Sequence, residues 1–288
     1  MEERVGLDAA WRLRTAESPL RNPREFFTLL LVDMRRAFYL GYVLFVRDFS
    51  AKYRQTLFGY LWAVLPVAFT TLLFIALSAA KVLQTTQADI PYPLFVLTGT
   101  VLWQTFFDSL MGPISGVQRS KTMLLKLNFP KEAVVVSALL EAAFNLVLRL
   151  LIVGVVLLCY SSLHPTGFLW FSLSTLSLVF LGTVLGVLFV PLSLLFHDVQ
   201  YALATFAGLW FFATPVVYPI PAGGTARSLL LLNPVSPLLT SSRAVLFNPE
   251  QQFPAAYFVI LILALVTAAL TWVFYRVAMP HVIERLGE

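Results

Sequence analysis

The sequence predicts an all-α integral membrane protein, and three features lead to that fold class. Hydrophobic residues make up 59% of the 288 residues and charged residues only 12%, with a mean hydropathy of +0.81. About a quarter of a typical soluble domain is charged. Six apolar segments reach the roughly 20 residues that a helix needs to cross a bilayer, and most basic residues fall on one side of them. We therefore expect six transmembrane helices per chain, with no separate soluble domain.

The six expected spans form one transmembrane domain, residues 33–276, between an N-terminal arm (1–32) and a short tail (277–288). The spans are expected at about residues 57–80, 92–111, 132–160, 167–195, 199–219 and 254–276. The start of the arm carries both charge signs and lacks the apolar core of a cleavable signal peptide. The N-terminus is therefore expected to be uncleaved and cytoplasmic.

An interfacial helix is expected ahead of the first span, at residues 33–55. Its apolar stretch, AFYLGYVLFV at 37–46, is too short to cross a bilayer and is flanked by Arg35, Arg36 and Arg47. A helix of this kind lies in the plane of the membrane surface. Its polar face is imperfect, so we expect it to contact other spans as well as lipid.

The basic residues set the expected orientation. Ten of the 20 lysines and arginines precede residue 57, four lie in the loop at 112–131 and two follow the last span. Because loops rich in lysine and arginine stay in the cytoplasm, both termini and the 112–131 loop are expected there. This asymmetry accounts for the isoelectric point near 9.4, so nucleic-acid binding is not expected.

Motifs of common enzymes are absent from the sequence. It has no G-x-x-x-x-G-K-[ST] phosphate loop, so we do not expect the chain to hydrolyse ATP in that way. Its three histidines lack metal-ligand spacing, and no metal is expected. A membrane transferase acting on polyprenyl-linked sugars would need clustered acid–base or metal-binding residues. The scattered candidates are Asp108, Glu141, His197 and Asp198. A proton-coupled transporter using Glu141 is disfavoured, because no inverted repeat of three spans is found.

The loop GVQRSKTMLLKLNFPKE, residues 116–132, mixes apolar and basic side chains on a short segment. Pro130 ends any helix near Phe129, because its ring disfavours helical geometry in the preceding residue. Such a helix could insert into a groove of a cytoplasmic partner or rest on lipid headgroups. The residues alone leave these two alternatives open.

Glu141 and Arg149 lie within the third expected span, eight residues apart and near one face of the helix. Charged groups at membrane depth are costly and usually face protein or water. We expect them to contact polar groups of a neighbouring helix. A place in the lining of a hydrated substrate path is the alternative.

Aromatic residues are dense, and their flat rings could stack on sugars and let a glycan slide through a channel. Aromatic belts at the two membrane interfaces are the commoner reason for such rings. The candidates for a channel lining are Tyr60, Trp62, Trp103, Phe106, Phe107, Trp210 and Phe211.

Two further features concern packing. Gly182 and Gly186 form a G-x-x-x-G motif in the fourth span, which permits close helix contact within the chain or between two copies. The segment 216–247 is rich in proline and glycine yet partly apolar, and it is expected to form an external re-entrant hairpin. Broken backbone at membrane depth must be buried in protein or line a cavity, so this hairpin could close a pore.

Five stretches together resemble the type-2 ABC exporter permeases, in the branch that exports O antigens, capsules and teichoic acids. The first, RDFSAKYRQTLFGYLWAVLPV at 47–67, resembles the family's charged entry to the first span. The other four, in the family's order, are YPLFVLTGTVLWQTFFDSL at 92–110, LLKLNFPKE at 124–132, FHDVQYALATFAGLWFFATPVVYP at 196–219 and LNPVSPLLTSSRAVLF at 232–247. Phe58 and the long N-terminal arm depart from the family's pattern.

The resemblance implies a symmetric homodimer that forms a channel, with two copies of a separate cytoplasmic ATPase subunit beneath it. ATP and Mg²⁺ would be bound by that subunit, and this chain would hold no cofactor. Residues 117–129 would form the coupling helix that docks on the ATPase. The coupling residues expected there and just after it are Arg119, Lys121, Met123, Leu124, Leu125, Lys126, Phe129 and Glu132.

The resemblance also implies a substrate and its point of entry. A polyprenyl-linked polysaccharide, O antigen before capsule or teichoic acid, would cross the cytoplasmic (inner) membrane of a bacterium. Arg47, Lys52 and Arg54 would stand where its anionic pyrophosphate approaches, although anchoring at the membrane surface also explains these three cations. The nearest alternative is a drug or small-lipid exporter of the same superfamily, and a polyprenyl-sugar transferase is a further one.

Overall fold

The computed structural model describes residues 23–54, 56, 59–80, 90–127, 129–221 and 223–287. Side chains are described from residue 35 onward, except those of residues 53, 60, 63 and 226. The first part of the N-terminal arm, the first two residues of the first expected span and the side chain of Tyr60 therefore lie outside the description. The regular elements of the described part are all helices, which confirms the predicted all-α class.

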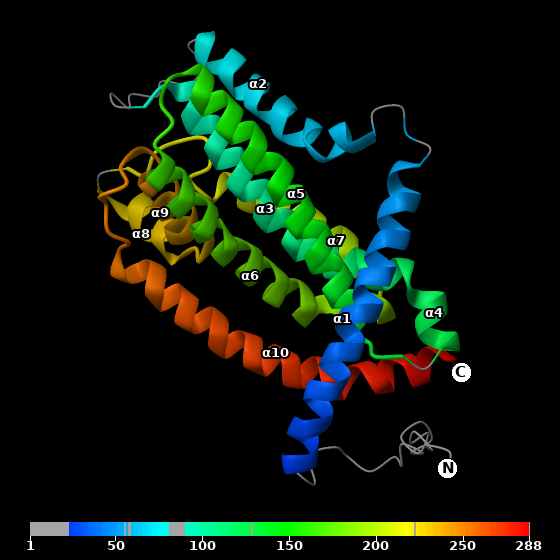
Figure 1. Cartoon of the computed structure of the whole chain (residues 1–288). Helices are drawn as coiled ribbons and strands as arrows, with labels where there is room; N and C mark the ends of the chain where they lie inside the picture. Colours follow the sequence, from blue (N-terminus) through cyan, green and yellow to red (C-terminus); the bar gives the residue numbers. More distant parts are fainter. Residues whose placement is uncertain are drawn as a thin grey trace, which may run out of the picture.

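Four helices in the described part are long and apolar enough to cross a membrane. They are α3 (Tyr92–Arg119), α5 (Glu132–Cys159), α6 (Pro165–Leu195) and α10 (Ala255–Gly287). These helices form the body of a bundle, with α10 along one side (Figure 1). The arrangement is that of a multi-pass membrane protein. Since α10 continues to Gly287, the residues expected as a separate tail are mostly helical.

The other two expected spans correspond to short helices, α2 (Leu65–Ala79) and α7 (Asp198–Phe212), of 15 residues each. At 1.5 Å per residue such a helix is about 22 Å long, shorter than the roughly 30 Å hydrocarbon core of a bilayer. The span expected at 199–219 thus ends early as a helix, before Pro215, which has no N–H to continue it. A 3₁₀ turn, η2 (Gly59–Ala63), precedes α2.

The first helix, α1 (Pro23–Tyr53), begins earlier than the interfacial helix expected at 33–55. Its first residue is a proline, whose fixed φ suits the first turn of a helix. In Figure 1, α1 runs across the end of the bundle where α4 (Lys121–Lys126) and the C-terminus lie. We call this the α4 end. The α4 helix stops at Lys126 rather than near Phe129, because Leu127 has extended backbone geometry.

Two short helices, α8 (Thr225–Leu232) and α9 (Val235–Phe247), lie at the opposite end of the bundle, near the start of α10 (Figure 1). We call this the α9 end. Asn233 and Pro234 join the two helices. Most side chains of α9 are buried, whereas those of α8 are largely exposed. The segment 216–247 therefore contains two short helices, of which α9 is packed into the protein.

The G-x-x-x-G motif is used within the chain. A Cβ atom added at Gly182 would lie 2.6 Å from the carbonyl oxygen of Phe106 on α3, and one added at Gly186 would collide with the carbonyl of Leu110. The absence of side chains at both positions lets α6 and α3 approach at backbone distance. This contact answers the question left open by the sequence, because the motif faces α3 and not the outside of the chain.

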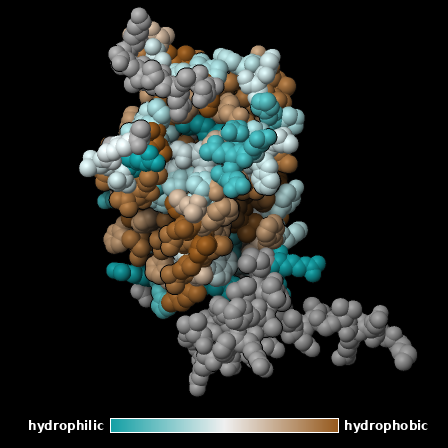
Figure 2. Space-filling model, turned by 90° about the vertical axis from the view of Figure 1, so that its left-hand side faces the viewer, coloured by the Kyte–Doolittle hydropathy of each residue, from teal (hydrophilic) through white to brown (hydrophobic). Residues whose placement is uncertain are grey.

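The buried apolar residues form one cluster at each end of the bundle. The α9-end cluster joins α2, α3, α5, α6, α9 and the first half of α10, and the α4-end cluster joins α1, α3, α4, α5, α6 and the second half of α10. Hydrophobic residues also cover broad areas of the outside, as Figure 2 shows for one face, where hydrophilic residues gather in the upper part. Apolar side chains exposed along α10 fit contact with lipid tails.

Candidate functional site

The α4 helix is anchored on one side and exposed on the other. Leu124 is buried in the α4-end cluster together with Ala37 of α1 and Met279 of α10. Leu125 and Leu127 are exposed apolar side chains at the same end. An exposed apolar patch of this kind is typical of a docking surface, so the geometry is compatible with the coupling role, which stays a prediction.

The segment after α4 is tied to α10. The Nε atom of Arg276 lies 2.9 Å from a carboxylate oxygen of Glu132, and the Tyr275 hydroxyl donates to the carbonyl of Lys131 at 2.9 Å. Phe129 packs against the α4-end cluster. Glu132 and Phe129, both expected in the coupling site, therefore hold the base of α5 against α10.

Two of the three cations expected at the substrate entry have partners within the chain. Arg47 pairs with its neighbour Asp48 at 2.7 Å and donates to the sulfur of Met123 on α4 at 3.5 Å. The Nζ atom of Lys52 lies 2.7 Å from a carboxylate oxygen of Glu141 on α5. Arg54 is exposed at the end of α1. A bound pyrophosphate at these residues would compete with carboxylates of the same chain.

Glu141 joins three helices. Its Oε1 accepts from Lys52 of α1, and its Oε2 lies 3.1 Å from Nη2 of Arg119, the last residue of α3. The sequence placed Lys52 at the substrate entry and Arg119 in the ATPase-coupling segment. For Glu141 it predicted a polar contact with a neighbouring helix, with a place in the channel lining as the alternative. The structure brings these three residues into one contact, which we call the Glu141 triad.

Arg149 lies deeper in the bundle and faces α3. Its side chain is only 2% exposed, and Nη2 lies 2.5 Å from Oδ2 of Asp108. The Asp108 carboxylate also accepts from the amide groups of Gln104, at 3.0 Å, and Asn145, at 3.4 Å. Both acidic residues noticed in the membrane region thus have cationic partners on a neighbouring helix. Among the described residues, no three side chains of His, Cys, Asp or Glu gather as they would around a metal ion.

Several aromatic residues expected to line a channel pack on one another instead. Trp103 and Phe106 of α3 are buried, and each contacts Trp210 of α7 edge to face, with ring centroids 6.3 and 5.3 Å apart. Phe211 packs against Trp103 at 5.7 Å. Edge-to-face packing of this kind stabilises a core. In this conformation Trp103 and Phe106 are inaccessible to a polymer.

The remaining lining candidates differ in exposure. Trp62 is exposed in the η2 turn ahead of α2, and Phe107 is half-buried on α3. A channel-lining role for them and for Trp210 stays a prediction.

Asn233 makes several hydrogen bonds at the α9 end, and it is not among the site residues predicted from the sequence. Its amide nitrogen donates to the Ala213 carbonyl at 3.1 Å and to the Thr214 hydroxyl at 2.8 Å. Its oxygen accepts from the Trp210 indole and from the backbone N–H of Val235, both at 3.0 Å. Asn233 therefore ties the end of α7 to the turn between α8 and α9. In the sequence, the Asn-Pro pair within the family-like stretch at 232–247 was the feature that could have pointed to this residue.

Arg243 of α9 is a second buried residue at this end. Its guanidinium lies 3.8 Å from the centre of the Phe95 ring and donates to the carbonyls of Pro215 and Val216 at 3.3 and 2.6 Å. A planar guanidinium suits stacking on a ring together with several hydrogen bonds. The arginine therefore fixes the segment after α7 against α3 and α9. In the sequence, a single arginine within an otherwise uncharged stretch was the feature that could have pointed to Arg243.

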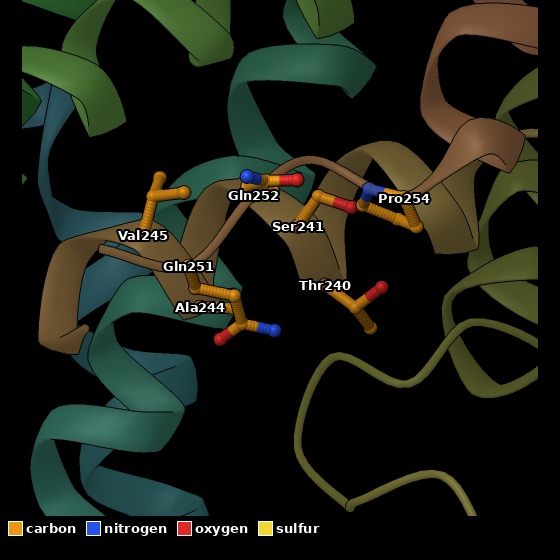
Figure 3. Close-up of a pocket in the computed structure, with 7 residues that line it drawn as sticks. All are labelled: Thr240, Ser241, Ala244, Val245, Gln251, Gln252 and Pro254. Carbon is orange, nitrogen blue, oxygen red and sulfur yellow. The ribbon is translucent and has the colours of Figure 1, made fainter. Parts of the chain in front are cut away.

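A shallow pocket of about 220 Å³ opens at the α9 end. Figure 3 shows its lining, which comes from α9 and from the segment leading to α10. The lining residues are Thr240, Ser241, Ala244, Val245, Gln251, Gln252 and Pro254. It offers hydroxyl and amide groups and no charged side chain.

The fold and these contacts define a helical multi-pass membrane protein. Long apolar helices form its body, and a short helix at one end presents apolar side chains.

Comparison with known proteins gives the family. No protein-family model matches the chain. Its sequence is 30% identical over 230 residues to the O-antigen export system permease protein RfbA of Myxococcus xanthus, covering 78% of this chain and 86% of the relative. A protein of the same name from Klebsiella pneumoniae is 22% identical, covering 75% and 86%. The polysialic acid transport protein KpsM of Escherichia coli is 23% identical, covering 69% and 78%.

The chain belongs to the polysaccharide-export branch of the type-2 ABC exporter permeases. The family predicted from five sequence stretches is thereby confirmed, and with it the function of a permease subunit in polysaccharide export.

Proposed function

We propose that this chain is the membrane subunit that exports a polyprenyl-linked O antigen across the cytoplasmic membrane of a bacterium. The observation that carries this proposal is the similarity to an O-antigen export permease, which extends over 86% of that relative. Export would be driven by two copies of a separate ATPase subunit that binds ATP and Mg²⁺. This chain would supply the path and the docking surface.

The proposed topology has six membrane passages, with both termini and the α4 end in the cytoplasm. Exposed cations on α1 and at the end of α3, such as Arg47, Lys52 and Arg119, support this orientation through the positive-inside rule. The short helices α2 and α7 would complete the passages together with adjoining residues. The α8–α9 hairpin would then be a re-entrant element on the external side.

The proposed channel requires two copies of the chain. The surface of α7 supports this, because Ala207 is the one buried residue of that helix within the single chain. A membrane helix with so little contact in its own chain is available to pack against another copy. Trp62, Phe107 and the exposed side of α7 would face the polymer.

The function is tested by deleting the gene in its own host and analysing the cell-surface polysaccharide. We expect the polymer to accumulate inside the cell on its lipid carrier and to return to the surface when the gene is restored. Normal surface polysaccharide in the deletion strain would contradict the proposal.

The docking role of α4 has its own test. Leu125→Asp places a charge on an exposed apolar position, whereas a change at the buried Leu124 would disturb the fold. We expect the variant chain to insert in the membrane normally but to lose copurification with the ATPase subunit. Undiminished copurification and export would exclude Leu125 from that interface.

A further inference from the structure

We propose that Glu141 is a positioning residue that makes the entry helix α1 move together with the ATPase-facing end of α3 and α4. The inference rests on the proposed function, since it presupposes an ATPase docked near α4. Coupling is a different role from the polar contact or the channel lining expected for Glu141. The residue would not touch the substrate.

The geometry of the Glu141 triad carries the inference. One carboxylate oxygen accepts from Lys52 at 2.7 Å, and the other faces Arg119 at 3.1 Å. Lys52 belongs to α1, while Arg119 is separated from α4 only by Ser120. A single side chain thus holds the two elements that the proposed mechanism must connect. A shift of α4 that displaces Arg119 would pull on the same carboxylate that holds Lys52.

A second contact joins the same two elements directly. Arg47 of α1 donates to the sulfur of Met123 on α4. Nearer the middle of α1, before Arg47 in the chain, Gly41 lies so close to α5 that an added Cβ would be 2.7 Å from Val136. The α1 helix is therefore packed on α5 at its middle and again near its C-terminal end, where Phe49 contacts Phe144 edge to face at 4.5 Å. That end of α1 is also linked to α4 and to the end of α3, so a displacement of α4 is passed to it.

The exposure of the triad favours a role in coupling over one in stability. The side chains of Lys52 and Arg119 are 47% and 43% exposed, and that of Glu141 is 18% exposed. Ion pairs as exposed as these contribute little to folding, with a typical value below about 1 kcal/mol. They can break and re-form as helices shift. Each oxygen of Glu141 has its own partner, so the contact links Lys52 and Arg119 through one side chain.

The first test compares Glu141→Gln with Asp48→Asn. Both changes remove one carboxylate charge, but Asp48 pairs with Arg47 of its own helix and joins no other element. We expect export per molecule of chain to fall up to about fivefold in the first variant and to stay unchanged in the second. Basal ATP hydrolysis by the purified complex should persist in both variants. A residue that only stabilises the fold would lower the amount of chain but not the export per molecule.

The second test measures whether α1 follows α4. Cys159 is the sole cysteine of the chain, so Cys159→Ser provides a background for spin labels at Ser50→Cys and Thr122→Cys, two exposed positions on α1 and α4. We expect the distance between the labels to be the same in nucleotide-free and vanadate-trapped complexes. With Glu141→Gln, that distance should differ between the two states.

A double change completes the test. If Lys52 acts through Glu141, Lys52→Gln combined with Glu141→Gln should lower export no further than Glu141→Gln alone. Additive losses would overturn the inference, as would normal export and an unchanged label distance in the Glu141→Gln complex. If the unmodified chain itself supported no glycan export, the proposed function would fail instead, so the two failures are distinguishable.

Discussion

Two ionic contacts join the same pair of helices, α3 and α5, and they differ in burial and in partners. In the pair of Asp108 and Arg149 the arginine is only 2% exposed, while the carboxylate is 24% exposed and is also held by neutral amide groups. At the α4 end, the carboxylate of Glu141 is shared by Lys52 and Arg119, whose side chains are nearly half exposed. The first contact stays within the two helices, and the second recruits α1.

The difference indicates where this helix pair is fixed and where it can rearrange. A buried charge that loses its partner keeps its desolvation cost, so the inner contact has to stay closed. An exposed pair loses little on opening, because water replaces the partner. The inner contact therefore acts as a permanent joint between α3 and α5, and the outer one as a reversible joint. Variants of the two contacts, with Asp48 and the neutral Asn233 as references, should differ in stability in the order given below, from the largest loss to the smallest.

Asp108→Ala should have the largest effect on stability. It leaves the guanidinium of Arg149 buried without its carboxylate, and breaking a buried pair costs about 3–5 kcal/mol. Thermal unfolding of the detergent-purified chain should shift to markedly lower temperature. The matched control is Asp108→Leu combined with Arg149→Met, which removes both charges and should recover most of the loss. Equal thermal stability of Asp108→Ala and the unchanged chain would show that the contact is not a permanent joint.

Asn233→Ala should have the next largest effect. It removes four hydrogen bonds, three of which tie the end of α7 to the α8–α9 turn, and the unpaired groups left behind cost about 1–3 kcal/mol. Because the site is neutral, the loss should be the same at low and high salt, as measured by thermal unfolding at two salt concentrations. Asn233→Asp retains the accepting oxygen but sets a carboxylate oxygen against the Ala213 carbonyl, so it should not recover the loss. A strong salt dependence of the Asn233→Ala loss would contradict this picture.

Glu141→Gln should lower stability by less than about 1 kcal/mol. The small loss should shrink further in concentrated salt, since about 1 M salt reduces the screening length to about 3 Å. The measurement is the difference in unfolding temperature from the unchanged chain at low and high salt. A loss as large as that of Asp108→Ala, or one indifferent to salt, would make Glu141 a permanent joint as well.

Asp48→Asn should leave stability unchanged. Its partner Arg47 is the adjacent residue of the same helix and also contacts Met123. Unfolding temperature and membrane insertion are the measurements, and the variant serves as the reference for loss of one acidic charge at this end. A clear destabilisation would mean that Asp48 has a role outside its helix.

Much of the bundle could be predicted from continuous apolar runs. The spans expected at 92–111, 132–160 and 167–195 correspond to α3, α5 and α6, and the starts of these helices agree within two residues. The end of α7 could not be placed in the same way, because residues 213–219 are as apolar as a helix but contain two prolines. Hydropathy measures composition, whereas the prolines and the hydrogen bonds of Asn233 decide the backbone path.

The candidate site was harder to predict, because its contacts join distant residues. Lys52 and Glu141 are 89 positions apart, and nothing local in the sequence shows that they meet. The same holds for Trp103 and Phe106, whose aromatic character suggested a channel lining but whose burial against α7 puts them in the core. Residue type predicts what a side chain can contact, not which neighbour it finds.

By itself, the sequence determined that this is a helical multi-pass membrane protein of the polysaccharide-export permease family. Composition, apolar run length and the order of short motifs are properties of the sequence, so they can be determined without knowing the fold. The tertiary structure alone decided that the G-x-x-x-G motif packs α6 on α3, that Arg149 is neutralised by Asp108 and that Glu141 joins α1 to α3. These contacts depend on how helices far apart in the chain are brought together, and only packing in three dimensions sets that.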